Sequence, residues 1–214
     1  MKIALSQQNY ILGDFDYNAN KILVHIEKAI ADKADIIVFS ELCLTGYPPT
    51  DFFYFEDYYQ KIEKVIERLL PYTKELGVFI GAPRKNPKVE GKDYFNSAYF
   101  LYQEKVQTVV DKTLLPTYDI FDEYRYFEPN NVFECINFKG KKVAVTICED
   151  IWDINLPNPL YSKDPMEELS KQSPDLMINL SASPFSFGHF KKRQAVVKEN
   201  CRTYKIPMIY VSAV

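Results

Sequence analysis

The stretch Val143–Asp153 reads VAVTICEDIWD, an apolar run that ends in a cysteine and two acidic residues. Five consecutive apolar or β-branched residues predict a buried strand, and Cys148 comes directly after it. In layered α/β proteins, ligands bind outside the carboxyl ends of the strands. Cys148 is therefore a candidate nucleophile, and its reactive form is the thiolate.

Two further apolar runs also lead into a reactive side chain. Asp35–Ser40 is followed by Glu41, and Val106–Asp111 is followed by Lys112. In one cleft, the carboxylate can take the thiol proton and return it to a leaving amine, while the ammonium stabilises an oxyanion. The pattern predicts amide cleavage by Glu41, Lys112 and Cys148, with Lys112 favouring the thiolate.

Each of these residues also has a simpler interpretation. Glu41 is then a solvated strand end, Lys112 a surface lysine, and Cys148 an inert core residue, since free cysteine is often buried. The remaining cysteines have no such neighbours and are interpreted as packing residues: Cys43, Cys135 and Cys201.

Helices alternate with strands towards both ends of the chain, and hairpins occupy its middle. Helical spacing of apolar residues predicts helices over 17–33, around 62–70, and over 165–172 and 189–204, with Asp16 as the first N-cap. The predicted strands cover 2–7, 36–39, 78–82, 97–101, 106–110, 132–138, 142–147, 175–180 and 207–212. This order predicts one α/β layered domain over residues 1–214. Because a strand comes last, we expect the domain to be incomplete at its C-terminal end.

The composition narrows the classes of protein to consider. With 214 residues, 47% of them apolar and 26% charged, the chain is typical of one soluble domain. No apolar run approaches the roughly 20 residues of a membrane helix, and the start is too polar for a signal peptide, so we expect no membrane partner and a cytoplasmic location. A net charge of -3 argues against nucleic acid as a partner. Without a CxxC pair or neighbouring histidines, no metal site is expected.

Three blocks resemble the nitrilase, or carbon–nitrogen hydrolase, superfamily, whose triad is Glu–Lys–Cys. They are FSELCLTGYPPTDFF at Phe39–Phe53, DKTLLPTYDIFDEYRYFEP at Asp111–Pro129, and VAVTICEDIWD at Val143–Asp153. The resemblance covers essentially the whole chain. It implies an α-β-β-α sandwich, with two such domains packed face to face in a homo-oligomer. It also implies that Glu41 is the general base, Lys112 the oxyanion stabiliser and Cys148 the nucleophile.

Within the superfamily, GYPPTDFF, DEYRYF and ICEDIW are similar to the glutaminase domains of glutamine-dependent NAD synthetases. That likeness implies glutamine as the substrate, with Tyr47, Tyr118 and Phe121 lining its pocket. Glu123 matches a second glutamate that helps to hold the lysine and the substrate. Ser183 would contact the amino-acid end of glutamine.

In that family, a C-terminal synthetase domain uses ATP and Mg to amidate deamido-NAD. Its SGGxDS signature is absent here. The resemblance therefore implies that this chain supplies ammonia without a cofactor of its own, and that the synthetase domain is its partner.

Three alternatives stay open. The first is a stand-alone amidase or nitrilase that acts on another small amide. The second is a cysteine–histidine hydrolase that uses Cys148 and His189, and it requires the two side chains to be neighbours. His189 stands where relatives often have a longer basic residue. The third is a non-catalytic protein that kept the fold.

Overall fold

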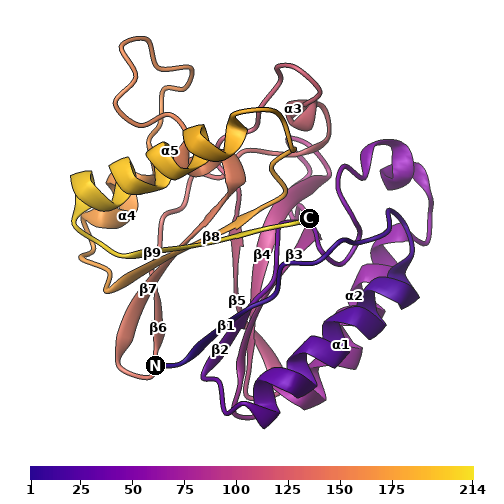
Figure 1. Ribbon diagram of the computed structural model, residues 1–214. Coiled ribbons are helices and arrows are strands. Elements are labelled where there is room, and N and C mark those ends of the chain that lie inside the picture. The colour runs from indigo at the N-terminus through magenta and orange to yellow at the C-terminus, as the bar shows by residue number, and fades with distance from the viewer.

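The computed structural model describes residues 1–214 and contains two β-sheets that lie face to face (Figure 1). The first sheet consists, in order across it, of β1 (Ile3–Leu5), β2 (Ile36–Val38), β3 (Gly77–Lys85), β4 (Tyr94–Tyr102) and β5 (Lys105–Asp111). The second consists of β6 (Ile136–Phe138), β7 (Lys141–Ile147), β8 (Leu176–Ser181) and β9 (Met208–Ser212).

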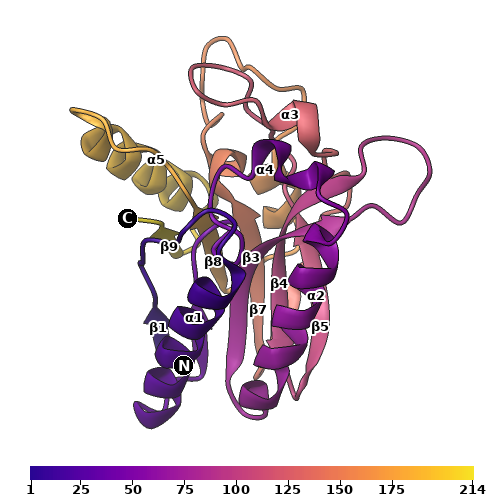
Figure 2. The same ribbon diagram turned by 90° about the vertical axis from the view of Figure 1, so that its right-hand side faces the viewer.

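Helices cover the outer face of each sheet. The α-helices are α1 (Phe15–Ala31), α2 (Tyr58–Leu69), α3 (Glu123–Tyr126), α4 (Pro165–Ser170) and α5 (His189–Tyr204). The 3-10 helices are η1 (Thr50–Tyr54), η2 (Leu70–Thr73) and η3 (Cys148–Ile151). Figures 1 and 2 show α1 and α2 on the outer face of the first sheet, and α4 and α5 on that of the second. The predicted α-β-β-α sandwich is confirmed.

Three apolar layers hold the sandwich together, because successive side chains of a strand point to opposite faces. In β2, Ile37 packs towards the helices α1 and α2, whereas Ile36 and Val38 pack between the two sheets. In β7, Ala144 packs towards α4, whereas Val143 packs between the sheets. Strands that are buried on both faces appear in the sequence as continuous apolar runs, which is why these were recognisable.

The strand directions decide where the candidate residues lie. β1, β2 and β3 are parallel, and β4 and β5 each pair antiparallel with the preceding strand, so β5 runs in the same direction as β2. In the second sheet, β7, β8 and β9 are parallel. The carboxyl ends of β2 and β5 therefore share one edge of the first sheet, and those of β7 and β8 share one edge of the second.

Two details of the predicted elements are wrong. The N-cap of α1 is Asp14 instead of Asp16, because the Asp14 carboxylate accepts a hydrogen bond from the Tyr17 backbone N–H. The strand expected over 132–138 begins only at Ile136, because the Asn130 side chain bonds both backbone groups of Val132 and holds a loop there.

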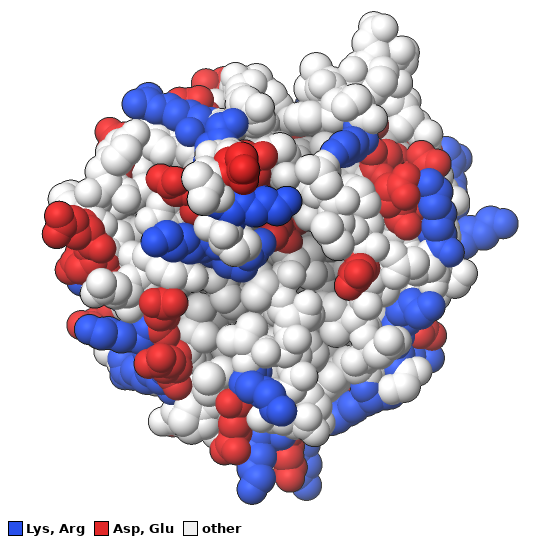
Figure 3. All heavy atoms as spheres, turned by 180° about the vertical axis from the view of Figure 1, so that it is seen from behind, with Lys and Arg blue, Asp and Glu red and all other residues white.

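The surface offers no single-sign region on the face seen in Figure 3, where acidic and basic side chains are interspersed. None of the helices has the length and apolarity that crossing a bilayer requires.

Candidate active site

The three candidate catalytic residues all stand at the ends of strands. Glu41 follows β2 by three residues, Lys112 directly follows β5, and Cys148 directly follows β7. Cys148 has a φ of 44°, a left-handed conformation that residues with a Cβ adopt rarely. Such conformations are concentrated at functional sites, where the surrounding structure enforces them.

A glycine in β3 allows the turn that carries Glu41 to lie directly on the sheet. A Cβ at Gly81 would come within 2.3 Å of the Leu42 nitrogen and 2.6 Å of the Ser40 carbonyl oxygen. The Leu44 N–H also donates to the Gly81 carbonyl at 3.2 Å. The backbone at Glu41 is thus fixed by a contact that only glycine permits.

Lys112 lies between two carboxylates in the interior. Its Nζ donates to Glu41 Oε1 at 2.7 Å and to Glu123 Oε1 at 2.8 Å, and its side chain is 0% exposed. Burying a charge is costly unless it is paired and hydrogen-bonded, and both conditions are met here. The interpretation of Lys112 as a surface lysine is therefore wrong.

The charges of this cluster set the protonation of its members. Burial alone would lower the pKa of Lys112, but Glu123 and Glu41 raise it well above its ordinary value, so Lys112 stays charged. Burial raises the pKa of Glu123, against the effect of Lys112.

Cys148 is a thiol in the free site. Burial raises the pKa of Cys148 well above its ordinary value, and Glu41 raises it further, while Lys112 opposes them. Lys112 does favour the thiolate, as expected, but burial and the nearby carboxylate outweigh its effect in the free site. Cys148 therefore needs a base before it can attack.

The Glu41 carboxylate is held at both oxygens. Asn96 Nδ2 donates to Oε1 at 2.8 Å, and the Ala182 backbone N–H donates to Oε2 at 2.8 Å. Asn96 comes from β4 and Ala182 directly follows β8, so Glu41 bridges the two sheets. This fixes its orientation towards the edge at which Cys148 also lies.

Asp150 clips the segment after Lys112 to the turn that begins at Cys148. Its carboxylate accepts backbone N–H groups of Thr113 at 3.0 Å, Leu114 at 2.8 Å and Ile147 at 2.9 Å. Burial raises the pKa of Asp150 to about 7. The two strand ends that carry Lys112 and Cys148 are thereby tied to one carboxyl group.

We expect Asp150→Ala to lower the free energy of unfolding by about 3 kcal/mol or more, because it leaves three buried donors unpaired at about 1–3 kcal/mol each. Urea unfolding measures the loss. Asp175→Ala is the matched control, because Asp175 also accepts a backbone N–H, that of Lys142 at 2.8 Å, but is partly exposed. An equal loss in both variants would contradict the assignment of Asp150 as the clip.

The residues expected to line the substrate pocket form an aromatic row that ends at a second carboxylate. Tyr47 donates to Glu123 Oε1 at 2.8 Å, and its ring lies 6.4 Å from that of Phe121. The rings of Phe121 and Tyr118 are 5.6 Å apart. Tyr118 donates to both oxygens of Glu149 at 2.8 Å.

A cavity of about 260 Å³ opens beside Glu41. Tyr47 and Ser183 also line it, so the structure brings these predicted residues together. Ser183 Oγ lies 3.1 Å from His189 Nε2, and the His189 ring stacks on Trp152 at 5.2 Å. His189 is engaged with these groups instead of Cys148, which removes the support for a cysteine–histidine hydrolase.

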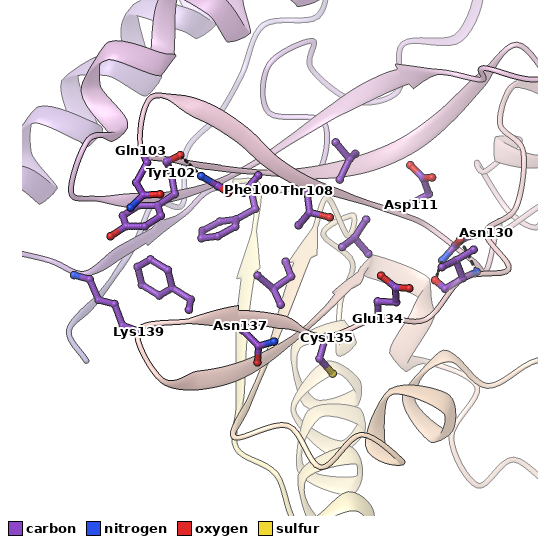
Figure 4. A pocket seen from close by; sticks show the side chains of 16 residues that line it. Phe100, Tyr102, Gln103, Thr108, Asp111, Asn130, Glu134, Cys135, Asn137 and Lys139 are labelled. Carbon is purple, nitrogen blue, oxygen red and sulfur yellow. Dashed lines mark hydrogen bonds between the residues drawn. The ribbon is translucent and has the colours of Figure 1, made fainter.

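A separate groove of about 600 Å³ lies between β5 and β6, the edge strands of the two sheets. Figure 4 shows Asp111 and Asn130 towards one end and Gln103 and Lys139 towards the other, with Phe100 between them. None of Glu41, Lys112 and Cys148 lines this groove.

Comparison with known proteins identifies the family. Residues 2–167 match the model of the carbon-nitrogen hydrolase family. The chain belongs to the carbon–nitrogen hydrolase family. The expectation of an enzyme of this class is confirmed.

Relatives of this carbon–nitrogen hydrolase domain are longer proteins. The glutamine-dependent NAD(+) synthetase of Synechocystis sp. is 34% identical over 99% of this chain and 39% of its own length. That of Thermotoga maritima is 32% identical over 100% of this chain and 35% of its own length. The chain thus spans well under half of these relatives.

Solved structures agree on the fold. A glutamine-dependent NAD+ synthetase from Acinetobacter baumannii, in complex with ADP, superposes with a TM-score of 0.89 at 29% identity, covering 99% of this chain and 38% of that one. An amidase from Nesterenkonia sp. has a TM-score of 0.82 at 16% identity, covering 100% of this chain and 76% of that one. At that identity the likeness concerns the fold alone.

Sequence reasoning missed several members of the candidate active site. Asn96 lies near the start of the antiparallel strand β4, whereas the sequence pattern pointed only to residues that follow the carboxyl ends of strands. Glu149 was considered only as a neighbour of Cys148, although its position next to the candidate nucleophile could have indicated a place in the site. Ser181 ends β8 and donates to Cys148 Sγ at 3.2 Å.

The sulfurs of the other cysteines form no hydrogen bond with Glu41, Lys112 or Cys148. Cys43 is buried in the layer between the first sheet and its helices, and Cys135 is partly buried against the layer beneath α4 and α5. Cys201 is half-buried. Their role in packing stays a prediction.

Proposed function

We propose that this domain hydrolyses the side-chain amide of glutamine through a thioester on Cys148 and releases ammonia. The observation that carries the proposal is Lys112, held between Glu41 and Glu123 in the interior beside a buried thiol. Relatives named glutamine-dependent NAD(+) synthetases support glutamine as the substrate.

In the first half of the reaction, Glu41 takes the proton of the Cys148 thiol as sulfur attacks the amide carbon. Lys112 donates to the oxyanion of the tetrahedral intermediate, a contribution of about 3–4 kcal/mol in comparable sites. The carbon–nitrogen bond then breaks, and ammonia leaves with the proton that Glu41 returns. A glutamyl thioester remains on Cys148.

In the second half, Glu41 takes a proton from water, and the resulting hydroxide attacks the thioester carbonyl. Lys112 again stabilises the oxyanion. The carbon–sulfur bond breaks, glutamate leaves, and the thiol of Cys148 regains a proton. One carboxylate thus works in both halves as base and then acid, which explains why it is held at both of its oxygens.

The charged end of glutamine needs a partner in a site that excludes water. Glu123 is a poor candidate for the α-ammonium, because it already accepts from Lys112, Tyr47 and Asn96. Glu149 accepts only from Tyr118 and Tyr161, and no cation pairs with it. We therefore assign the α-ammonium to Glu149 and keep Ser183 as a contact of the amino-acid end.

We expect Glu149→Gln to lower kcat/KM for glutamine by about 30- to 5000-fold, because truncating one partner of a desolvated charge pair costs about 2–5 kcal/mol. Butyramide lacks the α-ammonium, so its slow hydrolysis should hardly change. Ammonia release from both amides measures the effect. Glu168→Gln changes a partly exposed glutamate and is the matched control, which should change neither rate.

The same assay tests the alternative that the protein is a general amidase. If the unaltered protein hydrolyses butyramide and glutamine with comparable kcat/KM, the case for a glutaminase is lost. Selectivity of about 10⁴ or more for glutamine supports it, since a site built around buried polar groups rejects analogues that leave them unpaired.

We further propose that residues 1–214 form the ammonia-supplying domain of a longer protein, whose synthetase domain uses ATP and Mg to amidate deamido-NAD. The share of each relative that this chain spans supports a second domain. We also propose a cytoplasmic homo-oligomer. The exposed phenylalanines Phe185, Phe187 and Phe190 support association, because exposed apolar patches mark interaction sites.

A further inference from the structure

A chain of hydroxyl groups leads from β9 to the Cys148 sulfur. Tyr210 donates its O–H to Ser181 Oγ at 2.7 Å, and Ser181 donates to Cys148 Sγ at 3.2 Å. The three residues belong to β9, the end of β8 and the turn after β7, which are neighbours across the second sheet. No other side chain donates a hydrogen bond to this sulfur.

The direction of the chain follows from the donors available. A serine hydroxyl has a single hydrogen. While Ser181 donates that hydrogen to the Cys148 sulfur, its oxygen can only accept a hydrogen bond from another group or remain unpaired. Ser181 is 0% exposed, and the Tyr210 O–H is the protein donor that reaches its oxygen. The Tyr210 O–H fills this place and leaves the Ser181 hydrogen directed at Cys148.

Tyr210 is itself held in place. It lies on the helix-facing side of β9, where the guanidinium of Arg193 from α5 stands 5.7 Å from its ring centroid. In β8, Asn179 lies on the same face as Ser181 and donates to the Cys148 carbonyl oxygen at 3.4 Å. The backbone and the sulfur of Cys148 are therefore both supported from the neighbouring strand.

We propose that Ser181 is a positioning residue that aims and stabilises the Cys148 sulfur when Glu41 removes its proton, and that Tyr210 keeps Ser181 in the donating orientation. The inference rests on the proposed role of Cys148 as nucleophile. Hydrogen bonds to an ionised acceptor are about twice as strong as neutral ones, so the chain matters most in the thiolate state. The hydrogen bond from Ser181 offsets part of the free-energy cost of burying the thiolate.

The test follows alkylation of Cys148 by iodoacetamide across pH, with labelled peptides identified by mass spectrometry. In Ser181→Ala, we expect the midpoint of the pH dependence to rise by about one unit, the equivalent of a tenfold change in the thiolate equilibrium. Tyr210→Phe should raise it by less, and the double variant should match Ser181→Ala. The two substitutions should not be additive, because in the proposed chain of hydroxyl groups Tyr210 acts on Cys148 only through Ser181.

Steady-state kinetics give a second measurement. We expect Ser181→Ala to lower kcat for glutamine by about 10- to 100-fold with KM little changed, the size of a lost hydrogen bond to a charged group. Two matched controls should leave the midpoint in place. Tyr99→Phe removes a buried hydroxyl that bonds the Pro83 carbonyl, and Ser212→Ala removes one that has no partner.

An unchanged midpoint in Tyr210→Phe would overturn the proposal, and this variant decides the question even if Ser181→Ala fails to fold. Effects that multiply in the double variant, or an equal shift in a control, would also overturn it. If the unaltered protein releases no ammonia from glutamine, the proposed function fails, while the alkylation midpoints still report on the chain of hydroxyl groups.

Discussion

Cys148→Ala is expected to abolish ammonia release from glutamine and glutamine-driven NAD synthesis, while synthesis from added ammonium continues. The proposed thioester cannot form without the sulfur, and removal of a catalytic nucleophile can cost about 10⁶ in kcat. In the proposed division of labour, the ammonium-driven reaction does not pass through this domain. Both activities should be measured side by side in the full-length protein.

Cys43→Ala is the control for this prediction, because it also removes a buried thiol but lies in the layer between the first sheet and its helices. It should keep glutamine use. If Cys148→Ala lost NAD synthesis from glutamine and from ammonium equally, the proposed division of labour would be contradicted. Retained synthesis from glutamine would contradict it as well.

Lys112→Met is expected to destabilise the protein by about 3–5 kcal/mol and to remove glutaminase activity, because it leaves Glu41 and Glu123 buried without a cation. Urea unfolding measures the loss of stability. Lys61→Met is the control, because Lys61 pairs with Asp57 at 2.7 Å with both side chains about half exposed. A surface pair of that kind contributes at most about 1 kcal/mol.

The loss of unfolding free energy in Lys112→Met should depend on pH. Burial already raises the pKa of Glu123 above its ordinary value of 4.5, and removing Lys112 raises it further. A carboxyl group with a raised pKa in the folded state contributes most below its ordinary pKa, and the contribution falls as the pH rises through the folded-state value. The variant should therefore be least impaired in acid. A deficit that grows towards low pH would contradict the buried cluster.

The fold could be predicted from the sequence where strands were buried on both faces. Continuous apolar runs marked β2, β7 and β8, and the residues that follow β2 and β7 included Glu41 and Cys148. Lys112 was predicted because it follows the strand β5, and it lies at the same edge because β5 runs parallel to β2 through two antiparallel steps.

Other parts of the site could not be predicted, because they depend on pairings between distant strands. Asn96 reaches Glu41 only because β4 runs antiparallel and brings its start to the same edge. Ser181 meets Cys148 because β8 pairs with β7, which periodicity does not reveal. The protonation of Cys148 depends on its burial, and a cysteine that follows a strand gives no sign of how deeply it lies.

Detection of the glutamyl enzyme tests the central claim most directly. Mixing the protein with glutamine, quenching in acid within one turnover and digesting it allows each cysteine-containing peptide to be weighed. The account predicts one glutamyl group, labile to mild base, on the peptide that contains Cys148 and on no other. Turnover of glutamine without this adduct, or an adduct on Cys43, Cys135 or Cys201, would contradict it.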